Sequence, residues 1–131
     1  MILVDTSAFF AASDRSDRNH TAAVKAWQEI IRQELPVFTH GFVVIETAAL
    51  MHRRLGHGVA TRFLSFLEGV EVVWVDGDLY RRAEERYLRG SPADLSLVDC
   101  VSFALMRSRG LEVCFTFDRH FEQEGFRRMP E

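Results

Sequence analysis

The chain begins with MILVDTS, residues 1–7, a short apolar run followed at once by an acid and two hydroxyl residues. The continuous apolar run Ile2–Val4 predicts a strand buried on both faces of a parallel sheet. Ligands of open α/β sheets bind beyond the carboxyl ends of the strands, so Asp5 follows its strand where chemistry usually occurs. Asp is also a common helix N-cap, which by itself explains Asp5 better. A functional reading therefore depends on other acids joining it.

Length and composition indicate one soluble globular domain spanning residues 1–131. Hydrophobic residues make up 47% and charged residues 27% of the chain, close to the averages for such proteins. No apolar stretch is long enough to cross a bilayer, and the N-terminus lacks the features of a secretory signal, so we expect a cytoplasmic protein. Cys100 and Cys114 lack metal-ligand spacing and lie in apolar surroundings, which predicts two reduced, buried thiols.

The charge balance argues against a protein that coats nucleic acid without specificity. The net charge is −3, whereas such binding needs a broad positive field. Lys25 is the only lysine, so nearly all the cations are arginines, which suit forked contacts with phosphate. Compositional bias explains this excess of arginine more simply, but a local phosphate-binding patch stays open.

Strand and helix patterns alternate along the chain and predict an α/β fold. A polar loop at 13–19 and another at 90–92 separate some of these elements. Because helices separate the strands, we expect a mostly parallel sheet with helices on both faces. Strands are predicted at residues 2–4, 37–39, 70–75 and 112–117, with a short edge strand at 126–127. Helices are predicted at residues 6–12, 20–34, 43–54, 59–67, 79–88 and 96–109, with a short helical turn at 118–122.

Glu46 lies within Phe42–Leu50, an otherwise apolar helical stretch that we expect to be largely buried. A buried carboxylate is costly unless it is paired or bound to a metal. An ion pair along the helix with Arg53 or Arg54 is the structural alternative, but Arg53 is seven residues away. The sequence therefore favours a functional role for Glu46.

Two further acids stand at the ends of predicted elements. Asp118 follows the strand 112–117 directly, in the same kind of position as Asp5. Asp99 comes three residues after Ser96 in a pattern that resembles a capping box, although Glu or Gln is the usual partner. Either interpretation puts Asp99 at a helix start near the strand ends. Together with Glu46, these residues would bring four carboxylates close together.

Carboxylates this close cannot all stay ionised unless something offsets their charge, and a divalent cation does so directly. Oxygen ligands select hard cations such as Mg²⁺ or Mn²⁺. The histidines are scattered along the sequence and suggest no zinc cluster; they are His20, His40, His52, His57 and His120. A metal held by carboxylates commonly handles phosphates, so the pattern points to hydrolysis of a phosphodiester.

The candidate residues divide by expected role. We expect Asp5, as the central residue, and Asp99 and Asp118 to hold the metal, and Glu46 to position or activate the attacking water. Hydroxyls that would orient the carboxylates are those of Thr6, Ser7 and Thr116. Phosphate contacts from the end of the helix that carries Glu46 would come from Arg53 and Arg54, although a solvated helix end explains these two as well. Asp94 precedes its helix and is expected to lie in solvent, outside the site.

Four stretches in this order resemble the PIN-domain ribonucleases, especially the VapC-type toxins of toxin–antitoxin pairs. They are ILVDTS at 2–7, VIET at 44–47, SLVDC at 96–100 and TFDRHF at 116–121. The resemblance covers essentially the whole chain. It implies one PIN-like domain with strand order 3-2-1-4-5, Mg²⁺- or Mn²⁺-dependent cleavage of RNA, and functional acids at Asp5, Glu46, Asp99 and Asp118. It further implies a homodimer and a small antitoxin protein whose tail blocks the acidic groove.

Other phosphate enzymes fit the residues less well. A haloacid dehalogenase-type phosphotransferase needs a second Asp where Ser7 stands, and a response-regulator receiver needs a later lysine than Lys25. Two alternatives stay open: a non-catalytic RNA-binding or assembly module on the same fold, and a nuclease that cuts DNA.

Overall fold

Five short strands form one parallel sheet in a computed structural model that describes residues 1–131. The strands are β1 (Ile2–Val4), β2 (Val37–His40), β3 (Glu71–Val73), β4 (Val113–Phe115) and β5 (Arg127–Met129). Their order is β3-β2-β1-β4-β5, and every neighbouring pair is parallel. The predicted α/β class and the order 3-2-1-4-5 are therefore confirmed.

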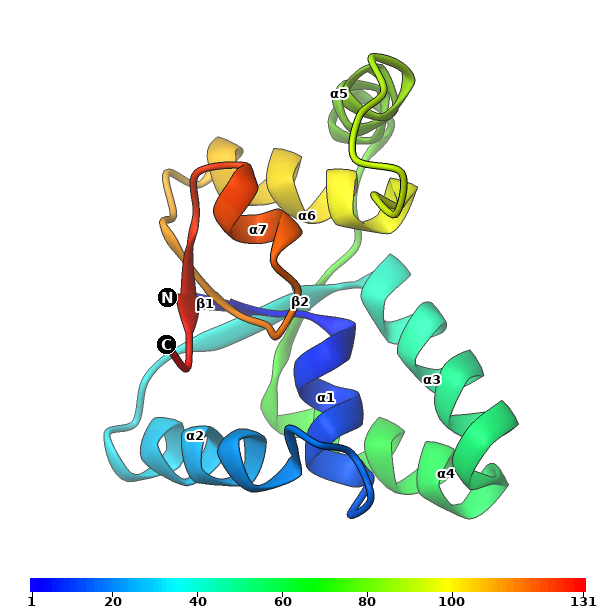
Figure 1. Ribbon diagram of the computed structural model, residues 1–131, viewed down its shortest axis with the longest axis vertical. Helices are drawn as coiled ribbons and strands as arrows, with labels where there is room; N and C mark the ends of the chain where they lie inside the picture. The colour runs from blue at the N-terminus through cyan, green and yellow to red at the C-terminus, as the bar shows by residue number, and fades with distance from the viewer.

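Helices connect the strands and cover both faces of the sheet (Figure 1). They are α1 (Thr6–Ser13), α2 (His20–Arg32), α3 (Gly41–Leu55), α4 (His57–Phe66), α5 (Gly77–Leu88), α6 (Leu97–Ser108) and α7 (His120–Gln123), with a 3-10 turn η1 at Leu67–Gly69. Each predicted element occurs, with its ends displaced by a few residues. None of these helices has the length and apolar character needed to cross a membrane.

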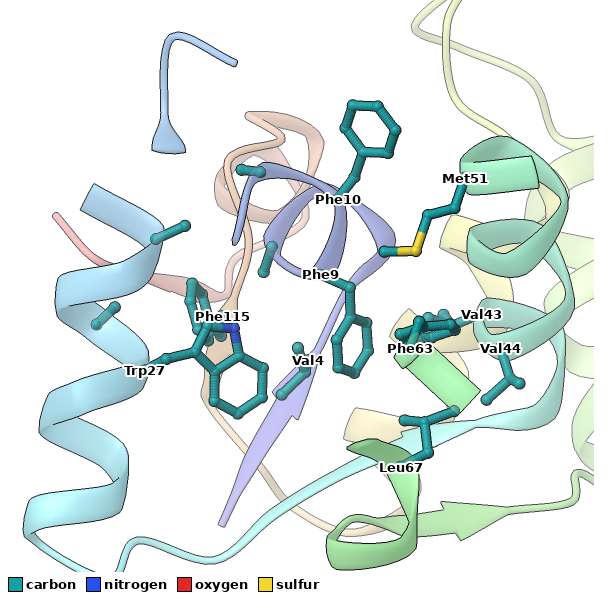
Figure 2. Packing of buried hydrophobic residues seen from close by; sticks show 14 of the residues in the cluster. Val4, Phe9, Phe10, Trp27, Val43, Val44, Met51, Phe63, Leu67 and Phe115 are labelled. Atoms are coloured by element: carbon teal, nitrogen blue, oxygen red, sulfur yellow. The ribbon is translucent and has the colours of Figure 1, made fainter. Parts of the chain in front are cut away.

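The larger core lies between the sheet and helices α1 to α4. Ile2 and Val4 point to this side together with Phe115 of β4. Trp27 of α2 packs over Phe115, with ring centroids 5.2 Å apart, and Figure 2 shows the two rings side by side. Phe9 of α1 meets the edge of another aromatic ring from α4, and these contacts fix α1 directly behind β1.

The second core lies on the opposite face, under α5, α6 and α7. Leu3 and Cys114, whose neighbours in their strands face the first core, point to this side. Phe103 of α6 and Phe121 of α7 pack edge to face, with centroids 4.9 Å apart. The side chains of β1 are thus buried on both faces of the sheet, which confirms the prediction made from the first apolar run. Cys100 and Cys114 are free and buried, also as predicted.

The register of the central strands brings the ends of β1 and β4 together. Leu3 pairs with Cys114 and Val4 with Phe115, and the amide of Asp5 donates to the carbonyl of Phe115 across 3.0 Å. The carboxyl ends of parallel strands share one edge of the sheet. The residues that follow β1 and β4 therefore meet at this edge, beside the first turns of α1 and α6.

Helix α3 differs from its prediction. It buries Val43, Val44, Thr47 and Met51 against the first core, but the turn between Val44 and Thr47 faces solvent. Ile45 is exposed although it is apolar. The expectation of a largely buried helix over Phe42–Leu50 is therefore wrong: a high count of apolar residues did not reveal that some of them face outward.

Candidate active site

A cavity of about 360 Å³ opens at the carboxyl edge of the sheet. All four acids singled out from the sequence line it: Asp5, Glu46, Asp99 and Asp118. They come from the ends of β1 and β4, from α3 and from the first turn of α6, so segments more than a hundred residues apart meet here. The lining is mainly polar, with Phe10 and Leu50 as its apolar members.

Asp5 sits deepest, with 4% of its surface exposed. Its Oδ2 atom accepts hydrogen bonds from the hydroxyls of Ser7 and Thr116, each at 2.9 Å, and a longer one from the amide of Ser7. Asp5 is thus also the N-cap of α1, as its type suggested. Burial raises the pKa of Asp5, and these hydrogen bonds only partly oppose the effect.

Two hydroxyls link the ends of β1 and β4. The hydroxyls of Ser7 and Thr116 lie 3.1 Å apart, Ser7 Oγ accepts from the amide of Phe117, and Thr116 Oγ1 accepts from the amide of Asp118. A single network therefore fixes the Asp5 carboxylate and the backbone that carries Asp118. A substitution at either hydroxyl would loosen both acids.

Asp99 forms the capping box that its sequence context predicted. Its amide donates to Ser96 Oγ at 3.1 Å, and its Oδ2 accepts from the amide of Ser96 at 3.2 Å. Burial raises the pKa of Asp99 to about 7, and the negative charges of Asp5 and Asp118 add to the effect. The side chain of Asp99 therefore caps α6 and also lies close to the other acids.

The negative charges of the clustered carboxylates are not balanced by cations of the protein. Neither Asp5 nor Asp99 forms an ion pair with a lysine or arginine, and the salt bridges of the molecule lie elsewhere, apart from the contact between Asp118 and His120. Burial of mutually repelling carboxylates without cations lowers the stability of the fold. The oxygen donors fit a divalent cation, which would offset that repulsion.

Glu46 lies at the mouth of the cavity and is exposed. The prediction that it is buried is wrong for the reason given for α3. It forms no ion pair with Arg53 or Arg54, so the structural alternative weighed for it is not present. A free carboxylate at the entrance can reach a ligand in the cavity.

The residues expected to orient the carboxylates or to contact phosphate differ in how they lie relative to the cavity. Thr6 lines the cavity, but its hydroxyl accepts from Thr47 at 3.0 Å and makes no hydrogen bond with a carboxylate. Arg53 and Arg54 are exposed at the end of α3. The guanidinium of Arg54 lies over the ring of Phe10, 5.8 Å from its centroid. Because Phe10 lines the cavity, Arg54 stands at its rim, whereas no contact ties Arg53 to it.

Sequence reasoning missed several residues of this region. Asp17 and Asn19 of the α1–α2 loop line the cavity, and so does Asp94, which was expected to lie outside the site. Asp94 is exposed, as predicted, but the loop before α6 places it in the lining of the cavity. Loop residues carry no periodic signal that would place them.

One histidine, which sequence analysis did not connect with the acids, lies beside two of them. Ligand atoms of Asp99, Asp118 and His120 all lie within 4.8 Å of one another. Asp5, expected as the central metal ligand, is not part of this tight group and occupies the deeper position described above. The sequence signal was present in the short spacing between Asp118 and His120, but the turn that brings their side chains together was not foreseen.

The fold and the acidic cavity define a class of protein that the comparisons identify. A family model of the PIN domain matches residues 2–126, so the chain belongs to the PIN-domain family. The resemblance noted from four short stretches is therefore confirmed.

Individual relatives agree with this assignment. The chain is 35% identical over 128 residues to the 23S rRNA-specific endonuclease VapC20 of Mycobacterium tuberculosis, covering 96% of this chain and 95% of that protein. The crystal structure of that bacterium's VapC20, described as a sarcin–ricin loop cleaving toxin, matches with a TM-score of 0.89 at 32% identity over 97% of both chains. FitAcB from Neisseria gonorrhoeae, at 16% identity and a TM-score of 0.67 over 98% of this chain and 96% of that chain, supports the fold alone.

Proposed function

We propose that this protein is a divalent-cation-dependent endoribonuclease, the toxin of a toxin–antitoxin pair, and that it hydrolyses one phosphodiester bond of 23S rRNA. The observation that carries the proposal is the convergence of four carboxylates on one cavity in a chain so similar to a 23S rRNA-specific endonuclease. Asp5, Asp99 and Asp118 would hold Mg²⁺ or Mn²⁺. When bound, such a cation offsets the carboxylate charge and stabilises negative charge developing on a phosphate.

The side chains divide the remaining work. Two hydroxyl groups donate hydrogen bonds to Asp5, so its carboxylate is held in a fixed orientation within the site. Glu46 stands free at the entrance, where it can orient the attacking water and accept its proton. Arg54, held over Phe10 at the rim, is placed to contact the phosphate backbone on either side of the cut. Arg53 would contribute charge only.

A single-stranded loop suits this cavity better than a duplex. Sequence-specific proteins read RNA mostly in loops whose bases are splayed out and stacked on aromatic rings or on arginine guanidinium planes. Phe10 is buried beneath the guanidinium of Arg54, so the exposed plane of Arg54 is the surface at the rim on which such a base could stack. The sarcin–ricin loop, which the related VapC20 is named as cleaving, is the substrate we propose here as well.

The test is cleavage of purified ribosomes, with cut sites mapped by primer extension on 23S rRNA. We expect one cut in the sarcin–ricin loop in the presence of Mg²⁺ or Mn²⁺, and none with Asp5→Asn. Parallel incubations with single-stranded and duplex DNA address the DNA-cleaving alternative. Cleavage of DNA at a rate equal to or above that of RNA would contradict the proposal.

The non-catalytic alternative is an RNA-binding or assembly module on the same fold. It predicts RNA binding by the parent chain without cleavage under any divalent cation, and equal binding by Asp5→Asn. The presence of all four acids around one cavity favours the enzyme, because a binding module has no need for mutually repelling buried carboxylates.

A small antitoxin protein belongs to the same proposal. A peptide that occupies the acidic cavity needs a cation to replace the metal, so an arginine or lysine in its tail is the expected contact. Co-expression of the reading frame next to this gene should abolish cleavage and yield a stable complex. A co-expressed neighbour that leaves cleavage unchanged would contradict this part of the proposal.

A homodimer is the expected assembly state. Support comes from exposed aromatic residues near the junction of β2 and α3. Trp74 is 71% exposed and packs on Gly41, where an added Cβ would lie 2.2 Å from the indole, and the ring of Phe42 lies beside that of Tyr80. Sedimentation analysis should give twice the chain mass for the parent and a monomer for Trp74→Glu. A monomeric parent chain would contradict the dimer.

A further inference from the structure

His120 occupies a position that neither the capping of a helix nor the packing of the core explains. It begins the short helix α7, and only 14% of its side chain is exposed. Its Nδ1 atom is buried and has no hydrogen-bond partner. A buried polar atom without a partner is rare in folded proteins and destabilises the fold unless a ligand satisfies it.

The contact between His120 and Asp118 has the distance of an ion pair but not the direction of a hydrogen bond. Nδ1 lies 2.9 Å from Asp118 Oδ1. That oxygen already accepts from the backbone amide of His120, also at 2.9 Å, and the imidazole nitrogen is not aimed at it. A hydrogen bond weakens steeply when its donor and acceptor are misaligned, so this contact contributes little as one. Nδ1 is therefore available to another partner.

The spacing of the neighbouring ligand atoms fits a metal ion. Two ligands that each bind one ion at about 2.1 Å lie roughly 3 to 4 Å apart. The ligand atoms of Asp99, Asp118 and His120 all lie within 4.8 Å of one another, so small side-chain rotations suffice to close on an ion. The ring of His120 lines a neighbouring cavity, with Gln123 and Glu124, and is not among the side chains that line the acidic cavity itself.

We propose that His120 is itself a ligand of the divalent cation, through Nδ1, beside the carboxylates of Asp99 and Asp118. The cation site then has mixed nitrogen and oxygen donors. Mg²⁺ prefers oxygen ligands, whereas first-row transition ions accept imidazole nitrogen. The site therefore selects Mn²⁺ over Mg²⁺, and His120 is the residue that sets this preference. This inference rests on the cation site of the proposed function.

The test measures metal binding directly, without RNA. Mn²⁺ and Mg²⁺ are titrated calorimetrically into the parent chain, His120→Ala and His120→Asn, and the Mn²⁺ complexes are examined by electron spin-echo spectroscopy for coupling to imidazole nitrogen. We expect nitrogen coupling in the parent and none in either variant. Mn²⁺ affinity should fall about tenfold or more in both variants, while Mg²⁺ affinity changes by less than about threefold.

His57→Ala serves as the matched control, because His57 is an exposed histidine at the start of α4, away from the acids. It should bind both ions as the parent does. Thermal unfolding of each variant checks that α7 still docks, and His120→Asn retains a polar side chain if His120→Ala unfolds.

Different failures separate the two proposals. Tight Mn²⁺ binding by the parent that is lost in Asp99→Asn, but without nitrogen coupling, would overturn only the role of His120. If His120 merely oriented Asp118, the affinities for Mn²⁺ and Mg²⁺ would fall by the same factor in the His120 variants. That result would also overturn the role of His120 as a ligand. Absence of any Mn²⁺ binding by the parent would overturn the cation site and this inference together.

Discussion

Strands β1 and β2 lie side by side and both lead into a buried polar residue, but the two residues are held in different ways. His40, at the end of β2, is fully buried, and both of its ring nitrogens have partners. Nδ1 accepts from the amide of Val43 at 3.4 Å, and Nε2 lies 2.8 Å from the hydroxyl of Ser102. Asp5, after β1, lies in a cluster of acids that has no balancing lysine or arginine.

The pKa values follow this difference. Burial lowers the pKa of His40 to about 4, so the ring is neutral and its two hydrogen bonds suffice. Burial raises the pKa of Asp99 to about 7, and hydrogen bonds to Ser96 do not compensate. The polar groups at the end of β2 are thus satisfied by the protein alone, whereas the carboxylates of the acidic cavity have no balancing cation within the protein. Unsatisfied burial is the feature that separates a candidate site from a structural one.

The largest expected effect is on activity. Asp118→Asn removes a carboxylate from the proposed cation site, and we expect cleavage of 23S rRNA to fall about 100-fold or more, since several kcal/mol of charge stabilisation is lost. The matched control is Asp78→Asn, which changes an exposed aspartate that pairs with Arg81 on α5. This variant should cleave at the parent rate. Equal rates for both variants would remove Asp118 from the site.

The next effect is a gain in stability. Asp99→Asn should raise the free energy of unfolding at pH 8 in EDTA, by about 4 kcal/mol at most, because ionised Asp99 is disfavoured in the fold. A raised carboxyl pKa means that stability falls as pH rises from 3.8 to about 7, so the gain should shrink toward pH 4. Urea unfolding at both pH values measures it. A variant less stable than the parent at pH 8 would contradict the account.

His40 should show the opposite pH dependence. The unfolded chain takes up a proton below the usual pKa of 6.5, whereas the folded chain does so only near 4. The free energy of unfolding therefore loses up to about 3 kcal/mol from this residue as pH falls from 6.5 to 4. His40→Gln should lack that loss when urea unfolding curves are compared with those of the parent, whereas the exposed His57→Gln should retain it. An unchanged pH profile in His40→Gln would show that His40 is not the cause.

The smallest effect concerns the partner of His40. Ser102→Ala leaves a buried ring nitrogen without its hydrogen bond, which should lower the free energy of unfolding by about 1 to 3 kcal/mol at pH 7. Ser65→Ala, at an exposed position of α4, should change it by less than about 0.5 kcal/mol. If Ser102→Ala is as stable as the parent, the end of β2 is not held as described.

Acids at strand ends were the part of the site that the sequence could predict. An apolar run followed by Asp5 or Asp118 identifies a buried strand and its carboxyl end, and parallel topology then brings the two ends to one edge. The capping box of Asp99 was equally visible, because three-residue spacing from Ser96 is a local signal. Local patterns therefore recovered the parallel α/β fold and the deeper half of the cavity, whereas the strand order came from the resemblance to PIN-domain ribonucleases.

Features that depend on tertiary packing could not be predicted. Glu46 was expected to be buried because its neighbours are apolar, yet Ile45 beside it faces solvent. His120 was set aside because the histidines are scattered along the sequence, and Asp94 because it precedes its helix and was expected to lie in solvent. Their places depend on how α7 and the loop before α6 fold over the sheet edge, which is decided by contacts distant in sequence.

The most direct measurement of the central claim is Mn²⁺ anomalous diffraction from crystals of the parent chain. The account predicts one or more ions in the acidic cavity, with carboxylate oxygens of Asp99 and Asp118 about 2.2 Å away. A cavity without an ion at saturating Mn²⁺, with the side chains of Asp5 and Asp99 turned into separate regions of solvent, would contradict it.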